Sequence, residues 1–196
     1  GVLTTRNGSD YILIHISTIS GSNYRLYIQQ NSSGGTYVNT YTDGLSIDTW
    51  HNVTITGEVG GKWDMYIDGN NSNQVQSASN IGAITQTANF KLGEDGSSRV
   101  FIGNIDEVSI FDKKLNLAEV TSIYNNGYPK DITALSPISW LRMGEDAYFD
   151  GTNFTIPNKI TSENATSTGL PATALVADAP GSYAAGLGSS LALDDR

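Results

Sequence analysis

The sequence predicts an all-β protein: an antiparallel β-sandwich, or jelly roll, with one short helix toward its C-terminal side and an extended C-terminal arm. Short runs of β-branched and aromatic residues alternate with polar ones, as in strands that bury one face. Between these runs stand residues that favour turns, and glycine alone accounts for 21 of the 196 positions. Many short strands with regular turn signals are typical of sandwiches and jelly rolls.

The first strands carry hairpin signals. Residues 11–16 form an apolar, β-branched run, and residues 24–29 alternate after a turn from Gly21 to Asn23. A second hairpin turns at Gly60-Gly61 and ends in an Asp68-Gly69 turn. The predicted strands cover residues 11–16, 24–29, 36–42, 50–57, 62–69, 90–93, 100–103 and 104–111.

One stretch has helical periodicity instead. Apolar residues recur at helical spacing from Leu115 to Tyr124, and Gly127 followed by Pro129 supplies a stop signal. We expect a single short helix that closes the β domain and packs its apolar stripe on the core. The pattern consists of Leu115, Ala118, Glu119, Val120, Ile123 and Tyr124.

The composition changes after Asp131. One further strand is predicted over residues 138–143, and from Asn158 onward the residues are small and polar with little periodicity. We therefore expect a β-sandwich over residues 1–130 and, over residues 131–196, an extended arm or the opening strands of a further or neighbouring unit.

The composition also excludes several kinds of site. The chain has no cysteine, which excludes disulfides and thiolate zinc sites, and two histidines are too few for a histidine-rich metal centre. With 20 acidic against 11 basic residues and a net charge of −9, nucleic acid is not an expected partner, because phosphate contacts need clustered positive charge. The same acidity suits hard cations such as calcium. No apolar run is long enough to span a membrane.

Five segments carry a resemblance to a known family. They are Trp50-His51-Asn52-Val53-Thr54, Met65-Tyr66-Ile67-Asp68-Gly69, Leu92-Gly93, residues 101–111 and residues 114–127. Their order and spacing make the region similar to the laminin-G-like and pentraxin-like jelly rolls of the concanavalin A-type lectin/glucanase superfamily. Leu3 to Ile14 also looks like a pentraxin strand pair, which extends the likeness to most of residues 1–130. The resemblance implies two antiparallel sheets, a curved concave face, and binding rather than chemistry.

The segments that usually open such a domain stand at the other end of this chain. Residues 139–145 resemble a domain opening, and residues 186–194 resemble the strand that follows it. Two interpretations are open. The chain is a segment of a longer protein in which such domains follow one another in tandem, or its last strands complete the sheet of a neighbouring subunit. Open sheet edges attract strands, so the second predicts a homo-oligomer, or assembly with other virion proteins, by strand exchange through residues 137–194.

The last sixty or so residues also look like segments of structural proteins from marine tailed bacteriophages. The likeness runs from Trp140-Leu141-Arg142-Met143-Gly144-Glu145 through Ala165-Thr166-Ser167, with Ala179-Pro180-Gly181. It implies a virion component such as a fibre, decoration or tail protein. The expected location is therefore extracellular or on a virion surface.

The family resemblance also implies a calcium site. Related domains take ligands from the loop before an early strand, which here holds Ser9 and Asp10, and from an acidic loop that here holds Glu94 and Asp95. Asp10, Glu94 and Asp95 would then supply three carboxylates to the metal. The alternative is that these are ordinary turn residues beside glycines.

No catalytic residues are predicted. Asp106 and Glu107 are adjacent within the strand expected over residues 104–111, so their side chains would point to opposite faces and could not address one substrate. A structural role is expected for this pair, and His15 and His51 are assigned to packing.

One aromatic residue is predicted to bind ligand. Trp63 follows two glycines and a lysine, and it is expected to be a surface aromatic that stacks a sugar, whereas Trp50 is expected to be buried.

The favoured function is a non-enzymatic virion structural and adhesion module that assembles with itself and touches host-surface glycan. The alternative is a secreted, calcium-dependent carbohydrate- or protein-binding domain of the lectin type. A glycan-cleaving enzyme is disfavoured, because related glucanases use acidic residues at alternating strand positions and no such run occurs here.

Overall fold

The computed structural model describes residues 1–21, 23–32, 36–83, 89–94, 100–181 and 190–193. The chain forms two compact units. Unit 1 comprises Gly1–Phe101 and Lys113–Val120, and unit 2 comprises Ile102–Asp112 and Thr121–Arg196. Among the described residues, no helix combines the length and hydropathy that crossing a membrane requires.

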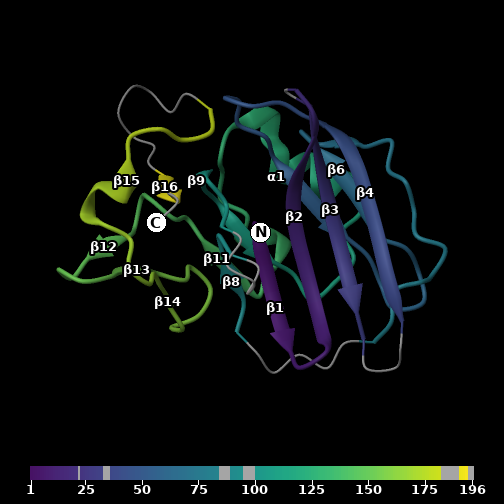
Figure 1. Ribbon diagram of the computed structural model, residues 1–196. Helices are drawn as coiled ribbons and strands as arrows, with labels where there is room; N and C mark the ends of the chain where they lie inside the picture. The colour runs from purple at the N-terminus through teal and green to yellow at the C-terminus, as the bar shows by residue number, and fades with distance from the viewer. Residues whose placement is uncertain (22, 33–35, 84–88, 95–99, 182–189, 194–196) are drawn as a thin grey trace. The chain divides into compact units, whose positions relative to one another are not determined.

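Unit 1 contains a five-stranded antiparallel sheet with strand order β4-β3-β2-β1-β8 (Figure 1). Gly8 and Gly21, at φ +62° and +56°, make the turns that connect β1 to β2 and β2 to β3, a backbone region that glycine enters without steric cost. The strands are β1 (Leu3–Asn7), β2 (Asp10–Ser20), β3 (Asn23–Asn31), β4 (Tyr37–Leu45) and β8 (Lys91–Leu92).

A second, smaller sheet of unit 1 has the order β5-β6-β7. Its strands are β5 (Val53–Thr56), β6 (Asp64–Ile67) and β7 (Asn70–Asn71). Asp68 and Gly69 connect β6 to β7 with φ values of 52° and 72°, the two positive values that a type I′ hairpin turn requires. The predicted Asp-Gly turn is confirmed.

The two sheets of unit 1 pack around one apolar core. Leu26 and Ile28 of β3, Leu45 of β4 and Met65 of β6 are buried and form a single cluster. Burying one such side chain stabilises the fold by about 1.5–3 kcal/mol. Partly buried side chains pack against this cluster from both sheets: Ile12, Ile14, Ile16, Tyr24, Ile55, Trp63 and Ile67. The predicted β-sandwich is confirmed.

The predicted helix is also present, as α1 (Leu117–Tyr124). Asn116 Oδ1 accepts the Glu119 N–H at 3.0 Å, and Glu119 Oε2 accepts the Asn116 N–H at 2.9 Å. This reciprocal pair is a capping box, which satisfies two N–H groups at the start of the helix. Gly127, at φ +85°, lies just beyond its C-terminal end, as the sequence predicts.

The strand predicted over residues 104–111 is interrupted. β9 (Gly103–Ile105) and β10 (Val108–Ile110) are separate strands with different partners. Glu107, between them, has φ +50°, a left-handed conformation that few residues other than glycine adopt. Strand alternation therefore does not run through Asp106 and Glu107.

Unit 2 is built from short antiparallel strands. β9 pairs with β16 (Ser190–Leu193), which also pairs with β15 (Leu175–Val176), and β10 pairs with β11 (Ser139–Leu141). A further sheet contains β12 (Tyr148–Phe149), β13 (Phe154–Ile156) and β14 (Ala165–Thr166). Short 3-10 helices cover Asn125–Gly127, Thr133–Leu135 and Ala172–Ala174.

The C-terminal region packs more closely than an extended arm would. Trp140, Phe154, Ile156 and Leu191 are at most 4 % exposed. Residues 182–189 and 194–196 of the predicted arm lie outside the described part of the chain. Unit 2 also takes in residues 102–112, so the compact units do not divide at the expected boundary between residues 130 and 131.

Candidate functional site

One face of the five-stranded sheet carries rings, amides and a charged pair. Leu26 and Ile28 of β3 point into the core, and side chains alternate along a strand. Arg25, Tyr27 and Gln29 therefore project from the opposite face. We name this surface the ring face. It comprises Tyr11, Leu13, His15, Arg25, Tyr27, Gln29, Tyr37, Asn39, Tyr41 and Asp43, of which Leu13 is buried.

Three rings stand in a row across the middle of the ring face. The strand register sets Tyr27 of β3 directly between His15 of β2 and Tyr41 of β4. The rings of His15 and Tyr27 are stacked, with centroids 4.7 Å apart and planes 10° apart. The rings of Tyr27 and Tyr41 are 5.5 Å apart and tilted by 45°. Aromatic pairs favour such offset and tilted arrangements.

Arg25 lies over this row. Its guanidinium carbon is 3.9 Å from the Tyr41 centroid and 5.9 Å from the Tyr27 centroid, within reach of a cation–π interaction. Arg25 Nε and Nη2 donate to the two carboxylate oxygens of Asp43 at 2.6 and 3.0 Å. These hydrogen bonds lower the pKa of Asp43 and raise that of Arg25. The fork fixes the guanidinium plane above the tyrosines.

The rest of the ring face is mostly polar, apart from the buried Leu13 opposite Gln29. Gln29 and Asn39 are cross-strand partners on β3 and β4, one row from the rings. Tyr37, in the next row, is 46 % exposed, and its pKa is raised by partial burial and by the nearby Tyr11. Amides both donate and accept hydrogen bonds. The face thus combines apolar ring surfaces with donors and acceptors, which are the groups needed to hold a hydroxyl-rich ligand.

Asp10 and Glu94, two of the three carboxylates predicted to bind one calcium ion, lie at opposite ends of β1. Gly93 N–H donates to Val2 O, at the start of β1, and places Glu94 beside that end. Asp10 pairs with Asn7, at the other end of β1. Five residues of strand span roughly 17 Å, so Asp10 and Glu94 cannot bind one ion. Glu94 instead makes an ion pair with Lys91 at 2.6 Å. Asp95 lies outside the described residues.

Trp63, which the sequence analysis predicts to stack a sugar, packs against the core instead. Trp63 is partly buried and packs against the cluster of Leu26, Ile28, Leu45 and Met65. Its backbone carbonyl accepts from Gln74 and Gln76. Trp50, expected to be buried, is half-buried. On the ring face, Tyr37 is exposed and Tyr27 and Tyr41 are partly exposed; exposed aromatic residues elsewhere in the described chain include Phe90, Tyr128 and Tyr148.

Unit 2 holds a cluster of three carboxylates that the sequence analysis missed. Ligand atoms of Asp106, Glu107 and Glu145 all lie within 4.8 Å of one another, close enough to share one cation. Asp106 and Glu107 were expected to point apart, and that expectation is wrong because the left-handed Glu107 ends the strand there. Glu145 approaches from a turn beyond β11. Burial, with repulsion from Glu145 and Glu107, raises the pKa of Asp106 to about 8.

The cluster fits calcium poorly. Glu107 accepts from Trp140 Nε1 at 2.7 Å with one oxygen and from Arg142 Nε at 2.9 Å with the other. Asp106 Oδ1 accepts the Glu107 N–H at 2.9 Å. Arg142 therefore supplies a positive charge already, and Asp106 supplies one proton at neutral pH. Calcium takes six to eight oxygen ligands, and these three residues have few oxygens left to offer.

A hydrogen-bonded chain of Ser46, His51 and Asp68 has the connectivity of a catalytic triad. His51 Nε2 lies 2.9 Å from Ser46 Oγ, and Nδ1 lies 2.8 Å from Asp68 Oδ2. However, Nε2 also accepts the backbone N–H of Ser46 at 3.2 Å. In serine hydrolases the N–H of the nucleophile faces the oxyanion, whereas here it bonds to the base. We interpret this chain as a clasp that holds the loop between β4 and β5.

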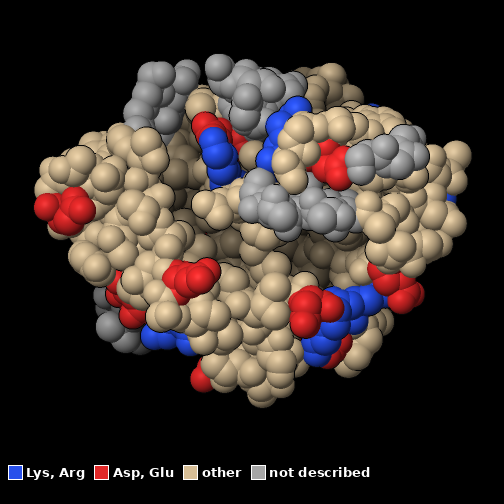
Figure 2. Space-filling model, turned by 90° about the horizontal axis from the view of Figure 1, so that it is seen from below, with Lys and Arg blue, Asp and Glu red and all other residues tan. Residues whose placement is uncertain are grey.

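Charged groups do not form a continuous basic surface on the face shown in Figure 2. There, Lys and Arg stand in small groups beside Asp and Glu, with uncharged surface between them. This arrangement suits a neutral or weakly charged ligand better than a polyanion.

Comparison with known proteins identifies the family. Residues 2–121 match the model of the concanavalin A-like lectin/glucanases superfamily. No curated protein and no solved structure matches the chain, and the likeness of its C-terminal residues to phage structural proteins stays a prediction. Laminin G-like domains of this superfamily are typically non-enzymatic binding modules, although the superfamily also includes glycosidases. Since the matched segment covers more than half of the 196 residues, the chain belongs to the concanavalin A-like lectin/glucanase superfamily.

Proposed function

We propose that the chain is a non-enzymatic carbohydrate-binding module and that a saccharide lies across the ring face. The observation that carries this proposal is the row of His15, Tyr27 and Tyr41 under the fixed guanidinium of Arg25. The row belongs to the segment that matches the lectin/glucanase superfamily. Laminin G-like domains usually act outside the cell, and we infer the same location for this one.

The chemistry of the ring face suits a sugar. A pyranose ring has an apolar face of C–H groups, which packs on aromatic rings, and a rim of hydroxyls, which need donors and acceptors. Tyr27 and Tyr41 offer the aromatic rings on which the C–H face would pack. Arg25, Gln29 and Asn39 offer the hydrogen-bonding groups for the hydroxyls. The row crosses three strands, a span of roughly 10 Å, which suits a di- or trisaccharide.

The test uses an array of neutral oligosaccharides, followed by calorimetry with the strongest binder. Tyr41→Ala should weaken binding by about three- to tenfold, because a well-placed aromatic contact contributes about 0.5–1.5 kcal/mol. Arg25→Gln should weaken it as well. The matched control is Tyr148→Ala, which removes an exposed tyrosine of unit 2 and should leave the affinity unchanged.

Two results would contradict the proposal. One is a folded protein that binds no saccharide on the array. The other is saccharide binding that Tyr41→Ala and Tyr148→Ala affect equally, because the ligand would then lie elsewhere.

Calcium dependence is the alternative, and one observation favours it: the three carboxylates of Asp106, Glu107 and Glu145 lie close together. Under our proposal, saccharide binding is the same in calcium chloride and in EDTA. If EDTA abolished binding and Glu145→Gln did the same, the calcium-dependent alternative would replace ours.

Glycan cleavage is not part of the proposal. A glycosidase needs one carboxyl group to donate a proton and another to attack or activate water. Both oxygens of Glu107 are engaged by Trp140 and Arg142, which leaves this carboxylate poorly placed for either task. Incubation with the bound oligosaccharide should therefore release no new reducing ends.

A further inference from the structure

Arg6 of β1 adds a cation to one end of the ring face. It pairs with Tyr11 across β1 and β2, and directly opposed residues of an antiparallel pair project from the same side of the sheet. The Arg6 side chain is exposed, and its guanidinium carbon lies 4.7 Å from the Tyr11 ring centroid, within the range of a cation–π interaction. Tyr11 thus holds Arg6 on this face without neutralising its charge.

Arg6 differs from the other Lys and Arg residues that the structure describes. Lys62 donates to three backbone carbonyls, and Lys130 donates to a serine hydroxyl. The others are paired with carboxylates: Arg25, Lys91, Lys113, Lys114, Arg142 and Lys159. The Arg6 guanidinium has no ion pair and no hydrogen bond within the described part of the chain. Its charge is therefore available to a ligand.

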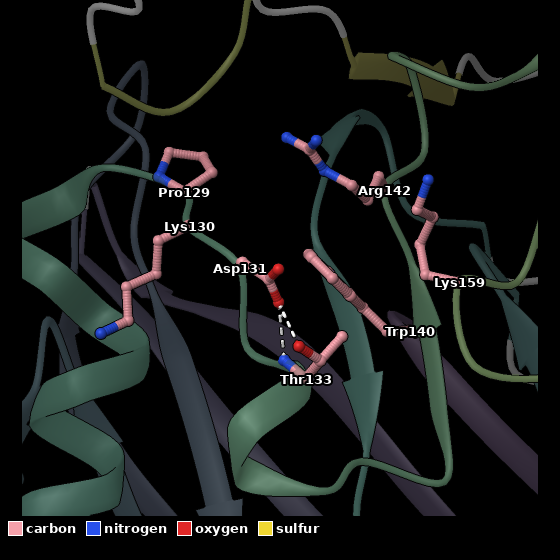
Figure 3. Close-up of a pocket in the computed structure, with 7 residues that line it drawn as sticks. All are labelled: Pro129, Lys130, Asp131, Thr133, Trp140, Arg142 and Lys159. Atoms are coloured by element: carbon pink, nitrogen blue, oxygen red, sulfur yellow. Dashed lines mark hydrogen bonds between the residues drawn. The ribbon is translucent and has the colours of Figure 1, made fainter.

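The pocket in unit 2 shows the contrast. Arg142 and Lys159 line it together with Asp131 (Figure 3). Both cations are already paired with carboxylates, at 2.9 and 3.3 Å. An anion in that pocket would compete with these carboxylates and would be repelled by Asp131. An anion beside Arg6 displaces no carboxylate.

With Arg6, the ring face carries a net positive charge in a chain whose net charge is −9. Asp43 is the acidic residue of this face, and Arg25 binds both of its carboxylate oxygens. Asp10 precedes Tyr11 in β2, but it is buried and projects from the opposite side of the sheet, because side chains alternate along a strand. The uncompensated charge on the ring face is therefore that of Arg6.

The position of Arg6 fits a ligand that also covers the aromatic row. Tyr11 and His15 are four residues apart on β2, which corresponds to roughly 13 Å along the strand, about the length of two or three sugars. Gln29 and Asn39 form the row between them. A saccharide stacked on the rings of His15, Tyr27 and Tyr41 would reach Arg6 with a branch or an extension of that length.

We propose that the ring face binds an acidic oligosaccharide, whose neutral sugars pack on the aromatic row while one anionic group, a carboxylate or a sulfate ester, pairs with Arg6. This inference rests on the proposed saccharide-binding function and names the class of saccharide. A guanidinium presents paired donors that match the oxygens of such a group. A single anionic group matches the single unpaired cation, whereas a polyanion would place further charges beside Asp43.

The test is calorimetry of the full chain with cellotriose and with β-1,4-galactotriose. Each is used in three forms: neutral, with C6 of a terminal sugar oxidised to a carboxylate, and with a sulfate on that C6. An anionic form should bind roughly two- to fivefold more tightly than its neutral parent, as expected for an exposed ion pair. This preference should disappear in about 1 M sodium chloride, because salt screens exposed charges. The form with the larger preference identifies the anionic group.

Arg6→Gln should abolish the preference and leave the affinity for the neutral trisaccharide unchanged, whereas Arg6→Lys should retain part of the preference. The matched control is Lys113→Gln, which makes the same change in charge. Lys113 lies near Leu115, whose N–H donates to Thr56 Oγ1, on the face of the β5-β6-β7 sheet that points away from the core. Lys113→Gln should therefore keep the preference.

The inference is overturned if neither anionic form binds more tightly than its neutral parent, if Arg6→Gln keeps the preference, or if Lys113→Gln removes it as well. In each of these cases, neutral binding that Tyr41→Ala weakens would still support the proposed function. If the folded chain binds none of the six probes, the proposed function and this inference fail together.

Discussion

At the scale of single residues, Asp106 is a strongly perturbed group. Burial and two neighbouring carboxylates raise its pKa from 3.8 to about 8. Its Oδ2 atom is buried and has no hydrogen-bond partner among the described residues. A carboxyl group in such a place keeps its proton at neutral pH, because the charged form loses both hydration and electrostatic balance.

The first prediction is a pH dependence of stability. The folded pKa of Asp106 lies above the unfolded value, so between about pH 4 and pH 8 the folded chain holds a proton that the unfolded chain has released. This group's contribution to stability is therefore complete below pH 4 and falls by about 1.4 kcal/mol per pH unit through that window. Asp106→Asn should remove the fall and become the more stable protein at pH 8.

The measurement is urea unfolding from pH 4 to pH 8 in EDTA. Asp112→Asn, at an exposed position of the same unit, is the control and should keep the slope of the wild-type protein. If wild type and Asp106→Asn have parallel pH profiles, Asp106 titrates normally and the burial argument fails.

At the scale of elements, the clasp of Ser46, His51 and Asp68 stabilises the connection from β4 to β5. Because His51 Nε2 accepts from Ser46, the ring proton is on Nδ1, which donates to Asp68. Asp68 Oδ1 also accepts the Asn52 N–H at 2.9 Å. The imidazole therefore connects the loop after β4 to the turn after β6.

The second prediction concerns that clasp. His51→Ala should lower the free energy of unfolding by about 1–2 kcal/mol, because several hydrogen bonds are lost at a partly buried site. Thr49→Ala, in the same loop, removes only a bond to the Ile47 carbonyl and should cost less than about 0.5 kcal/mol. A fluorophosphonate probe should not label Ser46 in either protein. Labelling that requires His51 would instead make this group a catalytic triad.

The elements also show what sequence patterns can and cannot predict. Alternation predicted β2, β3 and β4, and stop signals predicted the end of α1, because these features depend on neighbours in the chain. In Ile105-Asp106-Glu107-Val108, Asp106 is the only residue that favours a turn, and without a neighbouring glycine, proline or asparagine it is too weak a signal to predict a break. The break at Glu107 depends on the partners that β9 and β10 find far along the sequence.

The candidate sites were less predictable than the strands. The alternation of residues 24–29 already places Arg25, Tyr27 and Gln29 on one side of a strand. It does not say which side is covered, and that depends on the packing of the second sheet. The carboxylate cluster depends on Glu145, 38 positions beyond Glu107, and no local pattern connects residues at that separation.

At the scale of the whole molecule, strands from the C-terminal region pair with strands from the middle of the chain. β11 pairs with β10, and β16 pairs with β9. These are the strands for which exchange between subunits was predicted, and in this chain their partners are in cis. A homo-oligomer formed by exchange stays a prediction, since an exchanged pair would make the same hydrogen bonds in trans.

The last prediction follows from those pairings. A chain cut after residue 130 keeps β9 and β10 but loses β11, β16 and buried side chains such as Trp140 and Leu191. Unpaired strand edges associate with one another, so this fragment should aggregate or form oligomers by light scattering, with fast amide exchange over residues 103–110. Separately added residues 131–196 should restore protection there, because they bring the missing strands. A monomeric fragment with slow exchange at β9 and β10 would contradict this, and it would mean that residues 1–130 fold as the independent sandwich that the sequence suggests.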